Sequence, residues 1–289
     1  MSATTTETAP EQLPLIVSPT RSRRRLSPLD AVAAAIIVIA VLAAVFAPLL
    51  AGHSPTGGDI LEQFESPGGA HLLGTDENGN DIVARLLYGA RPSLLGPVAV
   101  VLLSLLVGIP LALVSVWRGG LTDAIIGRAL DLVFAFPAVL IASILVLLYG
   151  GGLFPAIVAV AISYIPWAAR LVRTATLRER HKPYVLACEI QGMSATWIAA
   201  RHVLPNLARL IAAQATVALG YALVDLAALS FLGLGIRPPA PDWGEMVADT
   251  AGFAQGNYTA PLAAAICIVL VVASVAHLGT RFFEGEEED

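Results

Sequence analysis

The sequence predicts an all-α integral membrane protein with six transmembrane helices. Hydrophobic residues make up 56% of its 289 residues, and its mean hydropathy of +0.75 points away from a soluble globule. Several segments of about 20 residues also carry no charge, which is the length that a hydrocarbon layer ~30 Å thick requires of a helix.

Weakly charged segments locate the six helices. Four segments are uncharged and a fifth, 210–236, carries one charge; the uncharged ones are residues 31–50, 94–117, 132–169 and 250–280. Residues 132–169 are long enough to cross twice, and the turn-forming sequence GGGLFP at 150–155 divides them. The predicted spans are therefore residues 29–51, 94–117, 130–149, 153–173, 208–234 and 258–280.

The N-terminal residues 1–28 are predicted to be a disordered tail. They are rich in Thr, Pro, Glu and Ser and end in the basic sequence RSRRR at 21–25. A secretory signal peptide is the alternative to a first true span, but a long segment precedes it and no clear cleavage site follows. A nucleic-acid partner for the arginines is not expected.

The distribution of Lys and Arg predicts the orientation of the chain. With the N-terminus inside, the inner segments hold 14 of these residues and the outer segments hold 3. Both termini are therefore predicted to be cytoplasmic. In this topology residues 52–93 form an extracytoplasmic loop, residues 178–206 a cytoplasmic hairpin within the 29–283 membrane domain, and residues 284–289 an acidic cytoplasmic tail.

The predicted extracytoplasmic loop offers two incomplete metal sites. The sequence DENGND at 76–81 resembles the start of a calcium loop, but Asp81 and Leu87 stand where such a loop needs Gly and Glu. An Asx-rich turn is the better interpretation. His53 and His71 have no third ligand that the sequence identifies, so no metal site is predicted.

Two further outer segments carry recognisable patterns. Ile82, Leu86 and Leu87 form an apolar stripe, which predicts a short helix lying on the outer membrane surface. Residues 233–247, GLGIRPPAPDWGEMV, form a proline-rich turn between the last two spans, which is either a rigid connection or a surface for an external partner. The docking candidates in it are Pro238, Pro239, Asp242 and Trp243.

The hairpin sequence, KPYVLACEIQGMSATWIAARHVLPN at 182–206, contains start and stop signals for two short helices. Pro183 suits the start of the first helix and Gly192 its end; Ser194 is placed to cap the second, which Pro205 limits. An ordered amphipathic hairpin fits a groove on a soluble partner. A membrane-surface anchor is the alternative.

The chain lacks the motifs of common catalytic sites. A phosphate-binding loop needs a lysine after a glycine-rich turn, whereas the single lysine, Lys182, stands between His181 and Pro183. The zinc-protease, nucleophile-elbow and Cys/His metal patterns are also missing. We therefore predict no catalytic residue, metal or cofactor in this chain.

Asp225 is the one acid predicted well inside a span. A carboxylate at the bilayer centre costs roughly 2.5–3.5 kcal/mol on insertion scales, so it must face protein, water or a partner. A structural bond between helices and a position lining a translocation path both remain open. An ion-coupled carrier would usually have several such groups.

The hairpin resembles the cytoplasmic motif of ABC importer permeases, E-A-A-x-x-x-G-x(9)-I-x-L-P. The matching residues, with the spacing intact, are Ala187, Gly192, Leu204 and Pro205; the departures are Leu186 for the Glu, Cys188 for the second Ala and His202 for the Ile. Three further segments resemble the C-type permease of dipeptide, oligopeptide and nickel importers: Leu72–Leu94, Leu130–Leu140 and Leu229–Met246. The resemblance extends over residues 25–283.

The resemblance implies a type I ABC importer permease fold and a subunit of a larger machine in the bacterial plasma (inner) membrane. The implied partners are a paralogous B-type permease, two cytoplasmic ATPases that bind ATP and Mg, and an extracytoplasmic substrate-binding protein. The hairpin would be the coupling helix that docks on an ATPase. Its implied coupling residues are Tyr184, Ala187, Cys188, Glu189, Gly192, Met193, Ser194, Leu204 and Pro205.

The leading functional prediction is a non-enzymatic permease subunit of an ATP-driven importer for di- and oligopeptides. An importer of nickel or a metal chelate is the alternative within the same class. A stand-alone secondary carrier and a membrane-bound signalling or scaffold protein are the alternatives from other classes.

Overall fold

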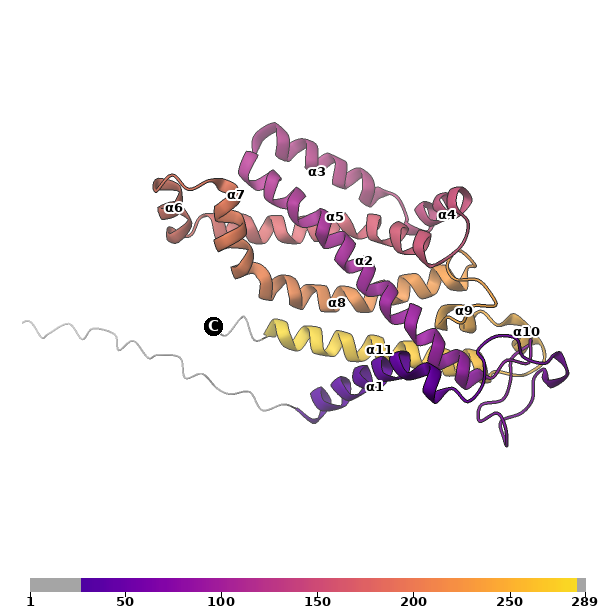
Figure 1. Ribbon diagram of the computed structural model, residues 1–289. Coiled ribbons are helices and arrows are strands. Elements are labelled where there is room, and N and C mark those ends of the chain that lie inside the picture. Colours follow the sequence, from indigo (N-terminus) through magenta and orange to yellow (C-terminus); the bar gives the residue numbers. More distant parts are fainter. Residues whose placement is uncertain (1–26, 285–289) are drawn as a thin grey trace, which may run out of the picture.

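The computed structural model describes residues 27–284, which form an elongated bundle of helices (Figure 1). The predicted terminal tails lie almost wholly outside these residues. The helices are α1 (Pro28–Leu50), α2 (Ile82–Arg118), α3 (Gly120–Ala135), α4 (Ala138–Tyr149), α5 (Leu153–Arg180), α6 (Pro183–Ile190), α7 (Ala195–Ile198), α8 (Leu204–Phe231), α9 (Trp243–Val247), α10 (Thr250–Ala254) and α11 (Thr259–Glu284). A 3₁₀ turn, Ile60–Glu62, and a π-helical turn, Ala199–Val203, complete the set.

The described residues contain five helices that are long and apolar enough to cross a membrane, or six if α3 and α4 form one span. The prediction of an all-α membrane protein is therefore confirmed. The predicted span at 130–149 is not one continuous helix: it takes in the end of α3 and all of α4, which meet at an 82° bend. Pro137 lies at this bend, directly before α4, where it cannot continue the hydrogen bonding of α3.

Helix α2 is longer than the sequence predicted. Its 37 residues begin at Ile82, so the predicted separate interfacial helix is wrong: those residues are the first turns of α2. Asp81 caps the helix by accepting a hydrogen bond of 2.7 Å from the Ala84 amide. At ~1.5 Å per residue α2 is about 55 Å long, which exceeds the ~30 Å of a hydrocarbon layer. Part of α2 therefore extends beyond the membrane interior.

The bundle separates two irregular regions (Figure 1). At one end, α6 and α7 form a hairpin; we call this the hairpin end. At the other end, residues 52–81 gather with α9 and α10; we call this the loop end. Between them, the buried core consists mainly of alanine, valine and leucine, as expected where membrane helices associate by close packing.

Gly108 shows how closely the helices approach. A Cβ atom at this position in α2 would lie 2.7 Å from the Ala168 Cβ and 2.9 Å from the Ala169 backbone nitrogen, both on α5. Real Cβ atoms do not make contacts of this length. The absence of a side chain at Gly108 therefore permits the α2–α5 contact.

We expect Gly108→Ala to lower the free energy of unfolding by about 1–3 kcal/mol, because the added methyl group overpacks the α2–α5 contact. The measurement is thermal unfolding of the purified protein in detergent. Gly127→Ala on α3 is the matched control, since a Cβ there meets nothing within 4 Å. Equal unfolding temperatures for the two variants would show that the contact tolerates a methyl group.

Candidate functional site

The hairpin end has the predicted helix–turn–helix form. Gly192 adopts a φ of +78°, which favours glycine, and its amide donates a 3.0 Å hydrogen bond to the Glu189 carbonyl. Ser194 caps α7 by accepting a hydrogen bond of 3.3 Å from the Trp197 amide. The turn is thus fixed by the residues that the sequence singled out.

The second half of the hairpin differs from the prediction. Helix α7 passes through the π-helical turn into α8, so that Ala195–Phe231 is one continuous helical segment. Pro205 does not limit it. Pro205 lies inside this segment, two residues after the π-helical turn Ala199–Val203, and proline and π-helical turns are both common local irregularities within continuous helices. The hairpin is therefore joined directly to a membrane-spanning helix.

The inner face of the hairpin is apolar and packs on the spanning helices. Val185, Ile198 and Val203 are fully buried, in one cluster with Ala112 of α2 and Val172 of α5. Tyr184, Cys188, Met193 and Leu204, all predicted coupling residues, are partly buried against the same cluster. This packing holds the hairpin to the helix bundle.

A hydrogen-bond network adds a polar anchor. The Tyr184 hydroxyl donates a 2.7 Å hydrogen bond to the buried Glu179 carboxylate of α5, and the Asn206 amide donates one of 3.0 Å to the Tyr184 oxygen. Lys182 forms an ion pair of 2.8 Å with the same carboxylate. Burial raises the pKa of Tyr184 to about 12, so the hydroxyl keeps its proton at neutral pH. Tyr184 thus positions the hairpin.

The outer face of the hairpin is unusually apolar. Ile190 is 87% exposed, and Leu186 and Trp197 are each 46% exposed. Of the predicted coupling residues, Ala187, Glu189, Gly192, Ser194 and Pro205 are exposed beside them. The sequence prediction missed Ile190, although its spacing of four residues from Leu186 on one helix was the available signal.

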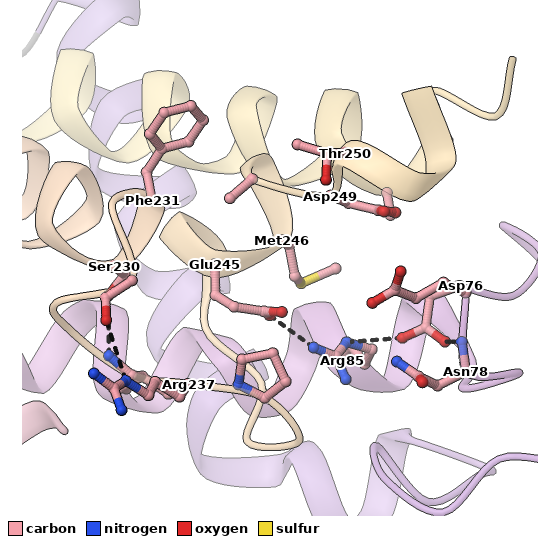
Figure 2. A pocket seen from close by; sticks show the side chains of 16 residues that line it. Asp76, Asn78, Arg85, Ser230, Phe231, Arg237, Glu245, Met246, Asp249 and Thr250 are labelled. Atoms are coloured by element: carbon pink, nitrogen blue, oxygen red, sulfur yellow. Dashed lines mark hydrogen bonds and ion pairs between the residues drawn. The ribbon is translucent and has the colours of Figure 1, made fainter. Parts of the chain in front are cut away.

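The loop end contains a buried arginine between two acids (Figure 2). Arg85 of α2 is 4% exposed. Its guanidinium lies 2.7 Å from the Glu245 carboxylate of α9 and 3.3 Å from the Asp76 carboxylate of the 52–81 loop, and it donates a 3.3 Å hydrogen bond to the Pro239 carbonyl. Burial raises the pKa of Glu245, while Arg85 opposes that shift. The sequence analysis missed this network.

The same network forms one wall of an open cavity of about 200 Å³. Arg237, Asp249 and Glu77 lie around it and give it both signs of charge. Figure 2 shows Arg237 and Asp249 on opposite sides of Glu245 and Arg85. The cavity has both charged and apolar lining residues and is open to the surface of the loop end.

Two of the predicted docking residues are buried. Asp242 and Trp243 are 5% and 3% exposed, so neither presents a surface to an external protein. Asp242 caps α9 and accepts a 2.8 Å hydrogen bond from Ser93, and the Trp243 indole donates one of 2.9 Å to the Leu86 carbonyl. Their place in the docking surface is corrected to a structural one. Pro238 is exposed, as is Pro239.

The DENGND segment forms the predicted Asx turn. The Asp76 carboxylate accepts hydrogen bonds of 2.8 Å from the amides of both Asn78 and Asn80. The Asn80 side chain in turn accepts one of 2.9 Å from the Gly58 amide. Asp76 therefore binds the backbone of its own segment, and Asn80 ties the segment to an earlier part of the same loop.

His53 and His71 do have a third potential ligand in the structure. Potential ligand atoms of these two residues and Asp81 lie within 4.8 Å of one another, a proximity that the sequence spacing did not reveal. His71 is buried, and its Nδ1 atom lies 2.9 Å from the Asp81 carboxylate. This hydrogen bond raises the pKa of His71. The contact with Asp81 thus gives the buried imidazole a hydrogen-bond partner.

Asp225 lies partly buried on α8. Its carboxylate accepts a 2.8 Å hydrogen bond from the Tyr164 hydroxyl on α5. Tyr164 also lines a groove of about 270 Å³ between the two helices. Both alternatives for Asp225, a contact between helices and a group beside a path, are thus compatible with its position.

The fold is that of an importer permease of known structure. An inward-facing structure of the MetNI methionine ABC transporter matches with a TM-score of 0.57 and 19% identity, over 70% of this chain and 95% of that chain. This likeness concerns the fold alone.

Comparison with known sequences shows the family to which the chain belongs. The dipeptide transport system permease protein DppC of Alkalihalophilus pseudofirmus is 36% identical over 93% of this chain and 90% of its own length. The glutathione transport system permease protein GsiD of Pectobacterium atrosepticum is 37% identical over 78% of this chain and 75% of its own length. The family model described as binding-protein-dependent transport system inner membrane component matches residues 100–285. The chain belongs to this family of inner-membrane permeases.

Proposed function

We propose that the chain is a permease subunit of an ATP-driven importer for di- and oligopeptides. The observation that carries the proposal is the hairpin, which exposes an apolar face while its other face packs against α2 and α5 and is hydrogen-bonded to α5. The peptide substrate is supported by similarity to the dipeptide permease named above.

The hairpin is the proposed docking element for an ATPase. Ile190, Leu186 and Trp197 supply apolar contact area, and the exposed predicted coupling residues surround them. Because α7 continues into α8, a displacement of the docked hairpin moves a spanning helix with it. ATP and Mg are bound by two partner ATPases, and this chain needs no cofactor of its own.

The orientation and partners follow from the same proposal. The hairpin end and both termini face the cytoplasm of a bacterial cell, in agreement with the excess of Lys and Arg there. A paralogous B-type permease supplies the other half of the translocation path. A substrate-binding protein docks at the loop end, where the exposed Pro238 lines the charged cavity and the exposed Pro239 follows it.

The test is uptake of a labelled dipeptide by liposomes that contain the complete importer. We expect uptake to require both ATP and the binding protein. Uptake that persists without the ATPases would support a secondary carrier instead. ATP-dependent uptake of nickel but not of dipeptide would assign the alternative substrate.

A further inference from the structure

The groove between α5 and α8 combines aromatic and polar side chains. Its volume is about 270 Å³, and α3 contributes one residue to it. The residues that give it this character are Phe134, Ser163, Tyr164, Trp167, Gln214 and Tyr221. Tyr221 is 66% exposed, so the groove opens at the surface of this chain.

Asp225 does not itself line this groove, but it lies one helical turn beyond Tyr221 on α8, and its carboxylate contacts the groove residue Tyr164. Among the described side chains, its carboxylate has one hydrogen-bond partner, the Tyr164 hydroxyl, at 2.8 Å. A phenol is a neutral donor, so it does not compensate the negative charge. The second carboxylate oxygen accepts no hydrogen bond from the described residues.

Other acids on the long helices and on α3 lie close to a cationic side chain or a histidine. Asp123 forms an ion pair of 2.7 Å with Arg173, and Asp131 forms one of 2.6 Å with Arg170. Asp30 lies 2.8 Å from His277, and Glu179 lies 2.8 Å from Lys182. Asp225 has no such cationic partner among the described residues. Of these acids, Asp225 is therefore the one whose negative charge no described residue neutralises.

The surroundings identify the chemistry of that missing partner. A carboxylate in a spanning helix is stabilised by a cation or by water, and aromatic faces attract cations as well. Tyr164, Trp167 and Tyr221 supply such faces, and Gln214 and Ser163 supply oxygen acceptors for the remaining ammonium hydrogens. A small organic cation with N–H donors fits this combination.

We propose that the groove beside Asp225 binds the protonated amino group of the transported peptide. This inference rests on the proposed function as a peptide importer. Asp225 supplies the charge, and the aromatic side chains surround the ammonium group during passage. The site would favour peptides with a free amino terminus over peptides whose amino group is blocked.

The test compares uptake of dialanine with uptake of N-acetyl-dialanine by liposomes that contain the complete importer. The binding protein is the same for every variant, so its own selectivity cancels when the preference of each variant is divided by that of the wild type. We expect Asp225→Asn to reduce the preference for the free amine roughly tenfold, the scale of one hydrogen bond to a charged group. Asp225→Glu, which keeps the charge, should preserve the preference.

Two further variants keep the inference falsifiable. Tyr221→Leu, at an exposed position, should lower the preference for the free amine roughly threefold through loss of a cation–aromatic contact. This variant tests the inference if Asp225→Asn does not assemble. Asp131→Asn is the matched control, because that acid has its own arginine partner, and it should leave the preference unchanged. An assembled Asp225→Asn variant with wild-type preference, or an unchanged preference in Tyr221→Leu, would overturn the inference. ATP-dependent uptake of neither peptide by the wild type would instead overturn the proposed function.

Discussion

Replacing Ile190 by aspartate is expected to weaken binding of the ATPase by about 30-fold, or ~2 kcal/mol, which is the scale of a central interface residue. Ile190 is the most exposed apolar residue of the hairpin, at 87%. In the docked state it would be desolvated, and a carboxylate in that place would be buried without a partner. Because the side chain makes no part of the buried hairpin cluster, the fold of the subunit should be unaffected.

The measurement is the affinity of the purified ATPase for the permease in detergent, followed by anisotropy of a labelled ATPase. Ile60→Asp is the matched control, since Ile60 is 71% exposed and belongs to residues 52–81 of the loop end. We expect this control to bind the ATPase as the wild type does. Equal affinities for Ile190→Asp and Ile60→Asp would show that the hairpin is not the docking element.

The turn itself offers a second variant for the same claim. Gly192→Ala adds a side chain at a φ of +78°, where a Cβ meets no neighbouring atom within 4 Å. Its cost is therefore backbone strain alone, of about 1–2 kcal/mol. Gly192→Asn should be milder, because asparagine tolerates this conformation. A coupling defect in the order Ala greater than Asn would identify the turn geometry as the cause.

Removing the charge of Arg85 is expected to destabilise the loop end by about 3–5 kcal/mol, the cost of leaving a buried charge without its partner. Arg85→Met leaves Asp76 and Glu245 facing each other without the guanidinium that lies 3.3 Å and 2.7 Å from them. The raised pKa of Glu245 should rise further, so that the acid takes up a proton as the pH falls from neutral. The variant should therefore recover part of its lost stability at lower pH.

Thermal unfolding between pH 5 and 8 checks this expectation. Arg237→Met is the control, since Arg237 is exposed at the same cavity and its guanidinium hydrogen-bonds to the Gly233 carbonyl. An exposed arginine contributes little to stability, so this control should unfold as the wild type does. Wild-type stability of Arg85→Met would refute a structural role for the network.

Hydropathy was sufficient to predict an all-α protein with several membrane spans, and turn residues were sufficient to predict the first helix and the turn of the hairpin. Proline and glycine act locally, so Pro183, Gly192 and Ser194 fixed the start, end and cap of the hairpin helices where the structure places them. The continuity of α7 with α8 was not predictable from Pro205, because a proline that follows a π-helical turn inside a helix and a proline that ends a helix look alike in sequence.

Contacts between segments that are distant in the chain could not be predicted from the sequence. Arg85 and Glu245 are 160 residues apart, and no local pattern links them. The same holds for Trp243 and the Leu86 carbonyl. An aromatic residue in a predicted outer loop suggested a surface position, whereas the Trp243 indole donates a hydrogen bond to a backbone carbonyl of α2. Burial of Asp242 and Trp243 follows from this tertiary contact.

The bend between α3 and α4 shows the limit of a hydropathy argument. Residues 130–149 are apolar enough to cross as one helix, but Pro137 interrupts the hydrogen bonds between the two segments. Hydropathy measures transfer to the membrane and contains no term for helix direction. The 82° angle therefore depends on packing as well as on the proline.

The central claim is that the apolar face of the hairpin binds an ATPase in the cell membrane. A photo-crosslinking amino acid at position 190 tests it most directly, with the same probe at position 60 as the control, in native membranes that contain the complete importer. The account predicts an adduct between position 190 and an ABC ATPase, and no such adduct from position 60. Adducts of position 190 with lipid alone would contradict the account and identify the hairpin as a membrane-surface anchor.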